Sequence, residues 1–212
     1  MKSRWKICLP ACASLLAATV FCFASETNNV AAAADKHAPS GNPTNWARRI
    51  EMPGVKNCFQ VTTNLFRGAQ PTAEGMTNLK ALGIKTVINL RTFHSDKDEV
   101  AGTGLKSARF ETKPWHGEEE DVVGFLKVVA DTNNLPALVH CQRGADRTGL
   151  MCAMYRITVC GWTKEQALAE MKDGGFGFSP TWKNLVTFVE KANIEDIKRR
   201  AGLSGKQKSE AR

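Results

Sequence analysis

A ten-residue segment of the chain brings together the side chains that phosphate-ester chemistry requires. It runs from His140 to Gly149 and reads His-Cys-Gln-Arg-Gly-Ala-Asp-Arg-Thr-Gly. Cys141 supplies a nucleophilic sulfur, and Arg147, six positions later, supplies a planar guanidinium that matches two phosphate oxygens. Because negative charge develops on those oxygens in the transition state, this pair of residues predicts a site for phosphoryl transfer.

The flanking sequence places this segment between a strand and a helix. The apolar run of residues 137–140 predicts a short buried strand, and apolar residues spaced by three and four from Leu150 to Ile157 predict a helix that ends near Gly161. Backbone N–H groups of a loop that enters a helix N-terminus form a nest for an anion. The same positive field lowers the pKa of a cysteine, so we expect Cys141 to be a thiolate near neutral pH.

The other residues of the segment have supporting roles in this interpretation. The phosphate is expected to be bound by Gln142, Arg143, Gly144, Ala145, Asp146 and Arg147. Gly144 permits a tight backbone turn toward the ligand. The Thr148 hydroxyl can donate a hydrogen bond to the sulfur and help to expel it, and we expect His140 to brace the loop by hydrogen bonding.

The segment resembles the signature of the cysteine-dependent protein tyrosine phosphatases, which is His-Cys, five residues, Arg, and then Thr or Ser. It is most similar to the compact bacterial branch that resembles dual-specificity phosphatases. Residues 65–71 and 79–91 are similar to the start of that domain, and residues 174–178 are similar to a segment near its end. The resemblance covers residues 58–192.

The resemblance implies a phosphocysteine intermediate at Cys141 and oxygen binding by Arg147, without a metal or a cofactor. We therefore expect a phosphomonoester hydrolase that acts on phosphotyrosine in proteins, with phosphoserine and phosphothreonine as further substrates. Inositol phosphates or phosphoinositides are the alternative substrates, although Asp146 offsets the charge that Arg143 adds to the loop. A catalytically inactive phosphate-binding module is a second alternative, against which the intact cysteine and arginine argue.

The general acid that protonates the leaving oxygen is less clearly marked. The family usually supplies an Asp from a loop roughly 25 to 35 residues before the cysteine, but residues 106–116 contain no Asp. Asp146 and Glu118 are equal candidates, followed by Glu119 and His116. The acidic residues after His116 can equally form the first turn of a helix, where the helix dipole favours carboxylates.

Strand and helix patterns alternate along the domain. Strands are expected at residues 64–67, 86–90, 108–112 and 137–140. Helices are expected at residues 72–82, 118–130, 147–159, 164–171 and 180–191, with Ser179 as the N-cap of the last. This order predicts a single α/β domain with a mostly parallel central sheet flanked by helices. A polar loop at the end of the second strand carries His94, Asp96, Asp98 and Glu99, and its place at a strand end would allow it to reach the mouth of the site.

The first 24 residues are typical of a secretory signal peptide. Lys2, Arg4 and Lys6 precede an apolar run over residues 7–23, and small residues follow that run. We expect export to the periplasm. The alternative is an uncleaved segment that anchors the protein in the inner membrane, which would be its only membrane contact.

The remainder of the chain divides by composition. Residues 25–57 are expected to be a flexible leader, residues 58–192 the phosphatase domain and residues 193–212 a charged tail that frays. The net charge is +8, and it is +5 without the three basic residues of the signal. That charge suits anionic substrates. The sequence lacks the stripe of basic and aromatic residues that would indicate a nucleic-acid partner.

Four cysteines remain after the signal, at positions 58, 141, 152 and 160. Cys152 and Cys160 lie about 12 Å apart on one expected helix, which is too far for a disulfide. We expect both to be buried thiols.

Overall fold

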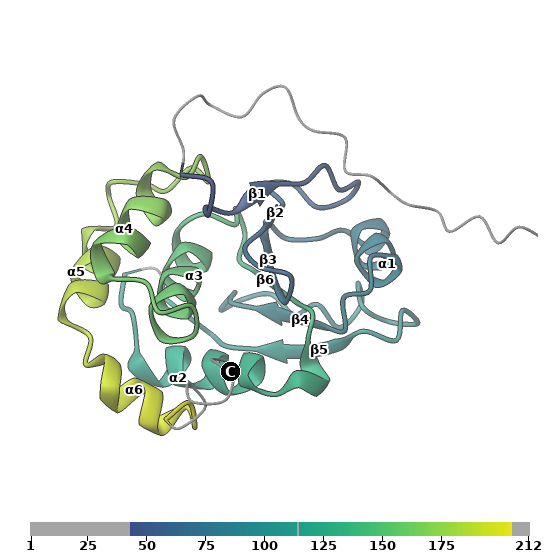
Figure 1. The fold of residues 1–212 in the computed structure, drawn as a ribbon. Helices are drawn as coiled ribbons and strands as arrows, with labels where there is room; N and C mark the ends of the chain where they lie inside the picture. Colours follow the sequence, from purple (N-terminus) through teal and green to yellow (C-terminus); the bar gives the residue numbers. More distant parts are fainter. Residues whose placement is uncertain (1–42, 114, 205–212) are drawn as a thin grey trace, which may run out of the picture. The chain divides into compact units, whose positions relative to one another are not determined.

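The computed structural model describes residues 43–113 and 115–204 of the 212-residue chain (Figure 1). The predicted signal peptide and most of the predicted leader lie outside the described residues. The described part is an α/β domain with a mostly parallel central sheet flanked by helices, as the sequence predicts. No helix within it is long and apolar enough to cross a membrane.

The sheet has six strands in the order β1-β2-β3-β6-β4-β5. They are β1 (Arg48–Arg49), β2 (Phe59–Gln60), β3 (Leu65–Gly68), β4 (Thr86–Asn89), β5 (Lys106–Arg109) and β6 (Ala137–His140). The pairs β3–β6, β6–β4 and β4–β5 are parallel, while β1, β2 and β3 pair antiparallel. Every residue of β6 is buried because helices cover both faces of the sheet. The chain that leaves β6 therefore starts from the middle of the sheet, between β3 and β4.

The six α-helices are divided unequally between the two faces of the sheet. They are α1 (Ala73–Ala81), α2 (Glu119–Ala130), α3 (Asp146–Thr158), α4 (Lys164–Asp173), α5 (Lys183–Lys191) and α6 (Ile194–Arg200). Helix α1 packs with Val87 and Leu138 on one face. The other five contribute to a larger core with the alternate strand residues Ile88 and Val139, as expected for side chains that alternate across a strand.

The ordered structure begins earlier in the chain than the sequence analysis expected. Residues up to 57 were assigned to a flexible leader, but β1 pairs with β2 and the side chain of Val55 is buried. A buried ion pair between Arg156 and Glu170 also binds this segment, since the Glu170 carboxylate accepts a hydrogen bond from the N–H group of Ala47 at 2.7 Å. These contacts could not be predicted from the composition of the segment, because they are made mainly by its backbone.

The expected charged tail also contains a helix. Helix α6 buries Ile197 completely, and Arg200 forms ion pairs with Glu119 and Glu120 at the start of α2. Its apolar face consists of few residues among many charges, so the sequence pattern of this short amphipathic helix is weak.

The largest boundary shifts are in β5 and α5. Strand β5 spans Lys106–Arg109 rather than residues 108–112, and α5 begins at Lys183 rather than at residue 180, with Trp182 as its N-cap. Ser179 is therefore not the N-cap of α5. Its backbone N–H instead donates to the Asp146 carboxylate at 2.8 Å.

Candidate active site

The loop that joins β6 to α3 turns its carbonyl groups away from its concave side. The carbonyl of Gln142 accepts a hydrogen bond from the N–H of Gln70 at 3.3 Å, and the carbonyl of Arg143 accepts one from the side-chain amide of Asn57 at 2.9 Å. A trans peptide carries its N–H opposite to its C=O. The outward carbonyls therefore leave the loop N–H groups facing inward, where an anion can bind them.

The next two carbonyls are bound by a buried arginine. Arg67 of β3 donates from Nη2 to the carbonyls of Gly144 at 2.9 Å and Ala145 at 3.3 Å. Gly144 has φ +70°, and a Cβ atom on it would lie 2.4 Å from the carbonyl carbon of Gly68. The loop thus packs directly on the end of β3, and both the conformation and the close approach require glycine at position 144.

Cys141 lies at the base of this loop and is buried, with 3% of its surface exposed. Burial raises the pKa of its thiol, but the hydroxyl and N–H of Thr148, the charge of Arg147 and the N–H of Gly144 favour the thiolate and outweigh burial. The net result is a pKa below the ordinary value of a cysteine. The buried Thr148 hydroxyl has no hydrogen-bond partner among the described residues, so it is available to the sulfur.

Arg147 is held by carbonyl groups from two other strand ends. Its Nη1 donates to the carbonyls of Leu90 at 3.1 Å, just after β4, and Thr112 at 3.3 Å, after β5. Neither partner is a carboxylate, so the charge of the guanidinium remains available to a phosphate. The structure thus brings the predicted nucleophile and the predicted oxygen-binding arginine to one loop.

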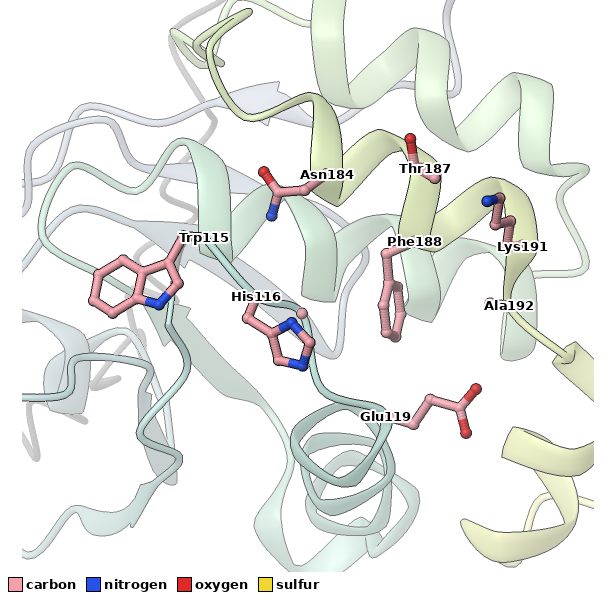
Figure 2. A pocket seen from close by; sticks show the side chains of 9 residues that line it. Trp115, His116, Glu119, Asn184, Thr187, Phe188, Lys191 and Ala192 are labelled. Carbon is pink, nitrogen blue, oxygen red and sulfur yellow. The ribbon is translucent and has the colours of Figure 1, made fainter.

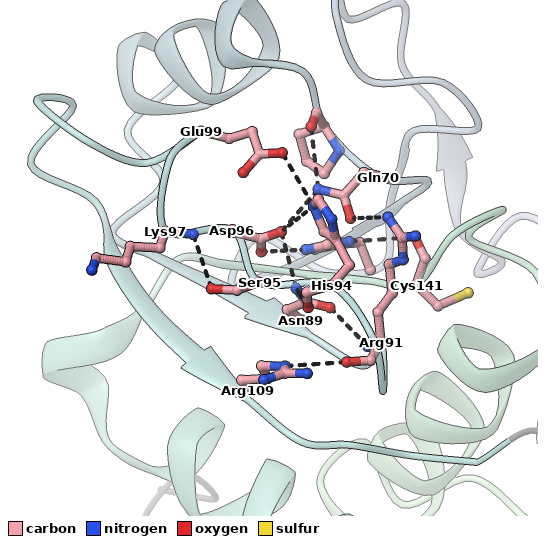
Figure 3. A network of polar contacts seen from close by, with 12 residues as sticks. Gln70, Asn89, Arg91, His94, Ser95, Asp96, Lys97, Glu99, Arg109 and Cys141 are labelled. Carbon is pink, nitrogen blue, oxygen red and sulfur yellow. Dashed lines mark hydrogen bonds and ion pairs between the residues drawn. The ribbon is translucent and has the colours of Figure 1, made fainter.

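His140 connects the loop to the polar segment after β4, in which Asp96 lies close to Gln70 and Asn89 (Figure 3). It is completely buried, and its Nε2 lies 2.8 Å from Oδ2 of Asp96. Asp96 also accepts hydrogen bonds from the side-chain amides of Gln70 and Asn89. Burial raises the pKa of Asp96, but the hydrogen bonds from His140 and Gln70 lower it below its usual range. This geometry fits a bracing role for His140 and places the polar loop against the site.

Within the described residues, one group of side chains has the spacing of a metal site. The ligand atoms of His94, Asp96 and Glu99 lie within 4.8 Å of one another. Both oxygens of Asp96 already accept hydrogen bonds, and Nε2 of His94 lies 3.1 Å from Glu99. The group is accounted for by this polar network, which supports His140.

The candidate general acids occupy different surroundings. Asp146 is 7% exposed, and its carboxylate accepts hydrogen bonds from Arg143 at 2.7 Å and from the Ser179 N–H. Glu118 is exposed at the N-cap of α2 and makes no capping hydrogen bond with its side chain. The next residues include Asp121, whose pKa burial raises although a hydrogen bond from Thr112 opposes the shift.

His116 and Glu119 line a pocket beside α5 instead (Figure 2). Its other walls include Trp115, which is 59% exposed, and Phe188 of α5. Glu119 also pairs with Arg200 at 2.9 Å. The residues that line this pocket do not include Cys141 or Arg147.

Three residues that hold the loop were not assigned a role by the sequence analysis. Arg67 and Gln70 lie in a stretch that was recognised only as similar to the family, and Asn57 was placed in the leader. Asn57 has φ +52°, a left-handed conformation that asparagine tolerates better than most residues. Its side chain also donates to the carbonyl of Phe176 at 2.9 Å, which joins the glycine-rich segment near residue 175 to the loop.

A parallel sheet whose central strand leads into an anion-binding loop with a buried cysteine and an arginine is the arrangement of a cysteine-based phosphatase. Residues 45–186 match the family model described as "DSP-PTPase phosphatase fused to NAD+ Kinase". The chain therefore belongs to this family of dual-specificity-type protein tyrosine phosphatases.

Individual relatives agree with the family. The chain is 35% identical over 157 residues to the dual specificity protein phosphatase TpbA of Pseudomonas aeruginosa, with 72% of this chain and 69% of that protein covered. The crystal structure of a TpbA variant in complex with pTyr is similar at a TM-score of 0.67 and 27% identity, and covers 77% of this chain and 99% of that chain. Inositol diphosphatase DSP3 of Arabidopsis thaliana is 25% identical over 67% of this chain and 72% of its own length.

The position of Thr148 gives a prediction about the thiol. The substitution Thr148→Val removes the hydroxyl while keeping the shape, so the pKa of Cys141 should rise. Because the thiolate is the reactive form and exists above the pKa, the curve of Cys141 alkylation rate against pH should move to higher pH. Iodoacetamide labelling followed by mass spectrometry of the Cys141 peptide measures the curve.

The matched control is Thr158→Val on the same helix, where the buried hydroxyl donates to the carbonyl of Met154 at 2.7 Å. It should leave the Cys141 curve unchanged. An unaltered curve in Thr148→Val would show that the hydroxyl does not stabilise the thiolate.

Proposed function

We propose that this protein hydrolyses phosphotyrosine in proteins, and phosphoserine and phosphothreonine to a lesser extent, through a phosphocysteine intermediate. The Cys141 sulfur attacks phosphorus while the ester oxygen leaves with a proton from the general acid. Water then attacks the phosphocysteine and gives a proton to the deprotonated general acid, which releases inorganic phosphate and restores both the acid and the Cys141 thiolate, the latter with the help of the Thr148 hydroxyl. Arg147 and the inward N–H groups of the loop bind the phosphate oxygens throughout.

One observation carries this proposal: a cysteine with a lowered pKa lies at the floor of a loop whose carbonyls all face outward. The loop residues 142–147 supply backbone N–H groups, and the planar guanidinium of Arg147 supplies two parallel N–H donors for the phosphate oxygens. The relative TpbA is named a dual specificity protein phosphatase, and a solved structure of it contains pTyr.

Hydrolysis of inositol phosphates is the second candidate, favoured by the similarity to a plant inositol diphosphatase. Polyanionic substrates benefit from unpaired positive charge around the site. Here Arg143 is paired with Asp146 at 2.7 Å, which reduces the charge that the loop offers beyond the first phosphate. The pairing therefore favours a substrate with one phosphate group.

The substrate is tested by phosphate release from the purified full chain without added metal. We expect the fastest release from a phosphotyrosine peptide, slower release from a phosphoserine peptide and the slowest from an inositol polyphosphate. Cys141→Ser should abolish release, and Arg147→Lys should lower kcat/KM by about 10²-fold or more because a point charge cannot bind two oxygens. Fastest turnover of the inositol compound would replace the first function by the second, and no turnover at all would favour an inactive binding module.

We also propose that Asp146 or Glu118 protonates the leaving oxygen. Asp146 lies in the loop itself, and Glu118 follows the segment that holds Arg147 through Thr112. An acid matters most for a poor leaving group, so Asp146→Asn or Glu118→Gln should lower kcat by about 10² to 10⁴-fold on a phosphotyrosine peptide. The same variant should act almost normally on para-nitrophenyl phosphate, whose leaving group departs without a proton.

Exposed Glu120, which forms an ion pair with Arg200, provides the control Glu120→Gln. Asp121→Asn belongs in the same series because burial raises the pKa of that carboxyl. Equal losses on both substrates in Asp146→Asn would indicate that Asp146 holds Arg143 and Ser179 in place and donates no proton. Wild-type rates for both Asp146→Asn and Glu118→Gln would exclude both candidates.

We propose that the protein is exported to the periplasm by a signal peptide of residues 1–24. The support is the basic start, the apolar run and the small residues that follow it. In a Gram-negative host, the protein should be found in the periplasmic fraction with a mass that lacks the signal. A form without residues 2–24 should stay in the cytoplasm, and full-length protein in the membrane fraction would support the anchored alternative.

A further inference from the structure

Arg67 is a buried charged side chain that the mechanism above does not use. It lies on β3 and is 1% exposed. It forms no ion pair with a carboxylate within residues 43–113 and 115–204, because the Glu170 carboxylate is bound by Arg156 at 2.7 Å and 2.9 Å. A buried arginine without such a pair is costly, so its position calls for another explanation.

The partners of Arg67 are the loop and one aromatic ring. Its Nη2 binds the carbonyls of Gly144 and Ala145, and the centre of its guanidinium lies 3.6 Å from the centroid of the Phe176 ring. The edge of Phe59 packs against Phe176 with a centroid distance of 4.7 Å. The guanidinium is therefore confined between the loop and an aromatic surface.

Arg67 is also coupled to the sulfur of the nucleophile. Burial lowers the pKa of Arg67, and its electrostatic coupling to the Cys152 and Cys141 sulfurs and to the Glu170 carboxylate acts in the opposite direction. A coupling between two charges is reciprocal. A thiolate at Cys141 that stabilises the charge of Arg67 is itself stabilised by that charge.

We infer that Arg67 is a positioning residue of the phosphate site, which holds the Gly144 carbonyl outward, supports the Ala145 carbonyl that the Gly149 N–H also binds at 2.8 Å, and places a fixed positive charge behind the loop. The peptide groups that carry these carbonyls also carry the N–H groups of Ala145 and Asp146, which are thereby turned toward the phosphate. Arg67 acts on the reaction through the loop and does not touch the substrate. The inference rests on the proposed function of the loop as a phosphate site.

The test compares Arg67→Met, which removes the charge and the donors but keeps the length, with Arg67→Lys, which keeps the charge. We expect Arg67→Met to raise the Cys141 thiol pKa, measured by alkylation against pH. It should also raise the inhibition constant of inorganic phosphate by about 10-fold and lower kcat/KM by about 10²-fold. Arg67→Lys should keep the thiol pKa near that of the wild type. It should bind phosphate more weakly, since one ammonium cannot reproduce the guanidinium hydrogen bonds that orient the loop carbonyls.

Arg156→Lys is the matched control, because Arg156 is a second buried arginine that binds Glu170 rather than the loop. It should lower the melting temperature without changing the Cys141 curve or phosphate inhibition. A folded Arg67→Met protein with wild-type thiol pKa and phosphate inhibition would overturn the inference. If Arg67→Met does not fold, wild-type phosphate inhibition in Arg67→Lys would overturn it equally.

The test of Arg67 and the test of the proposed function can succeed or fail independently. Phosphate release that Cys141→Ser abolishes establishes the function whatever the Arg67 variants do. If the wild-type protein released no phosphate, the Cys141 curve and the binding of inorganic phosphate measured by calorimetry would still decide the role of Arg67.

Discussion

Four consecutive carbonyl groups, of residues 142–145, must point away from the phosphate for this loop to bind an anion. Each has a donor from the segment between β1 and α1: the Gln70 N–H, the Asn57 amide and the Arg67 guanidinium. The arrangement of the sheet follows the same requirement. Because β3 is the parallel neighbour of β6, its end lies beside the loop, and the absence of a side chain on Gly144 allows the loop to approach the backbone of Gly68 closely.

The buried thiols of this protein show what the loop contributes. Burial raises the pKa of both Cys58 and Cys152 to about 11, and it acts on Cys141 in the same direction. Only Cys141 has hydrogen bonds from Thr148 and Gly144 and the adjacent charge of Arg147, and its pKa falls instead. The lowered thiol pKa of Cys141 thus depends on donors that point at a buried sulfur, where electrostatic interactions are stronger than in water.

The sequence allowed the central features to be predicted because they depend on local patterns. The strand before Cys141, the helix after it and the parallel sheet follow from apolar periodicity. Interactions between distant segments could not be predicted in this way. Nothing near Asn57 indicates that its amide reaches Arg143, and nothing near Ile197 indicates that α2 covers it, so the leader and tail were expected to lack structure.

The donors that orient the loop are distant from it along the chain. Arg67 lies 77 positions before Gly144, Asn57 lies 86 positions before Arg143, and the Asn57 contact with Phe176 spans 119 positions. Bringing such distant segments together costs loop-closure entropy. The orientation of the loop N–H groups therefore depends on the tertiary fold as well as on Gly144 and the start of α3. A local opening that separates β3 from β6 would withdraw the Arg67 donors while α3 stays folded, so the phosphate site should be lost in a smaller opening than global unfolding.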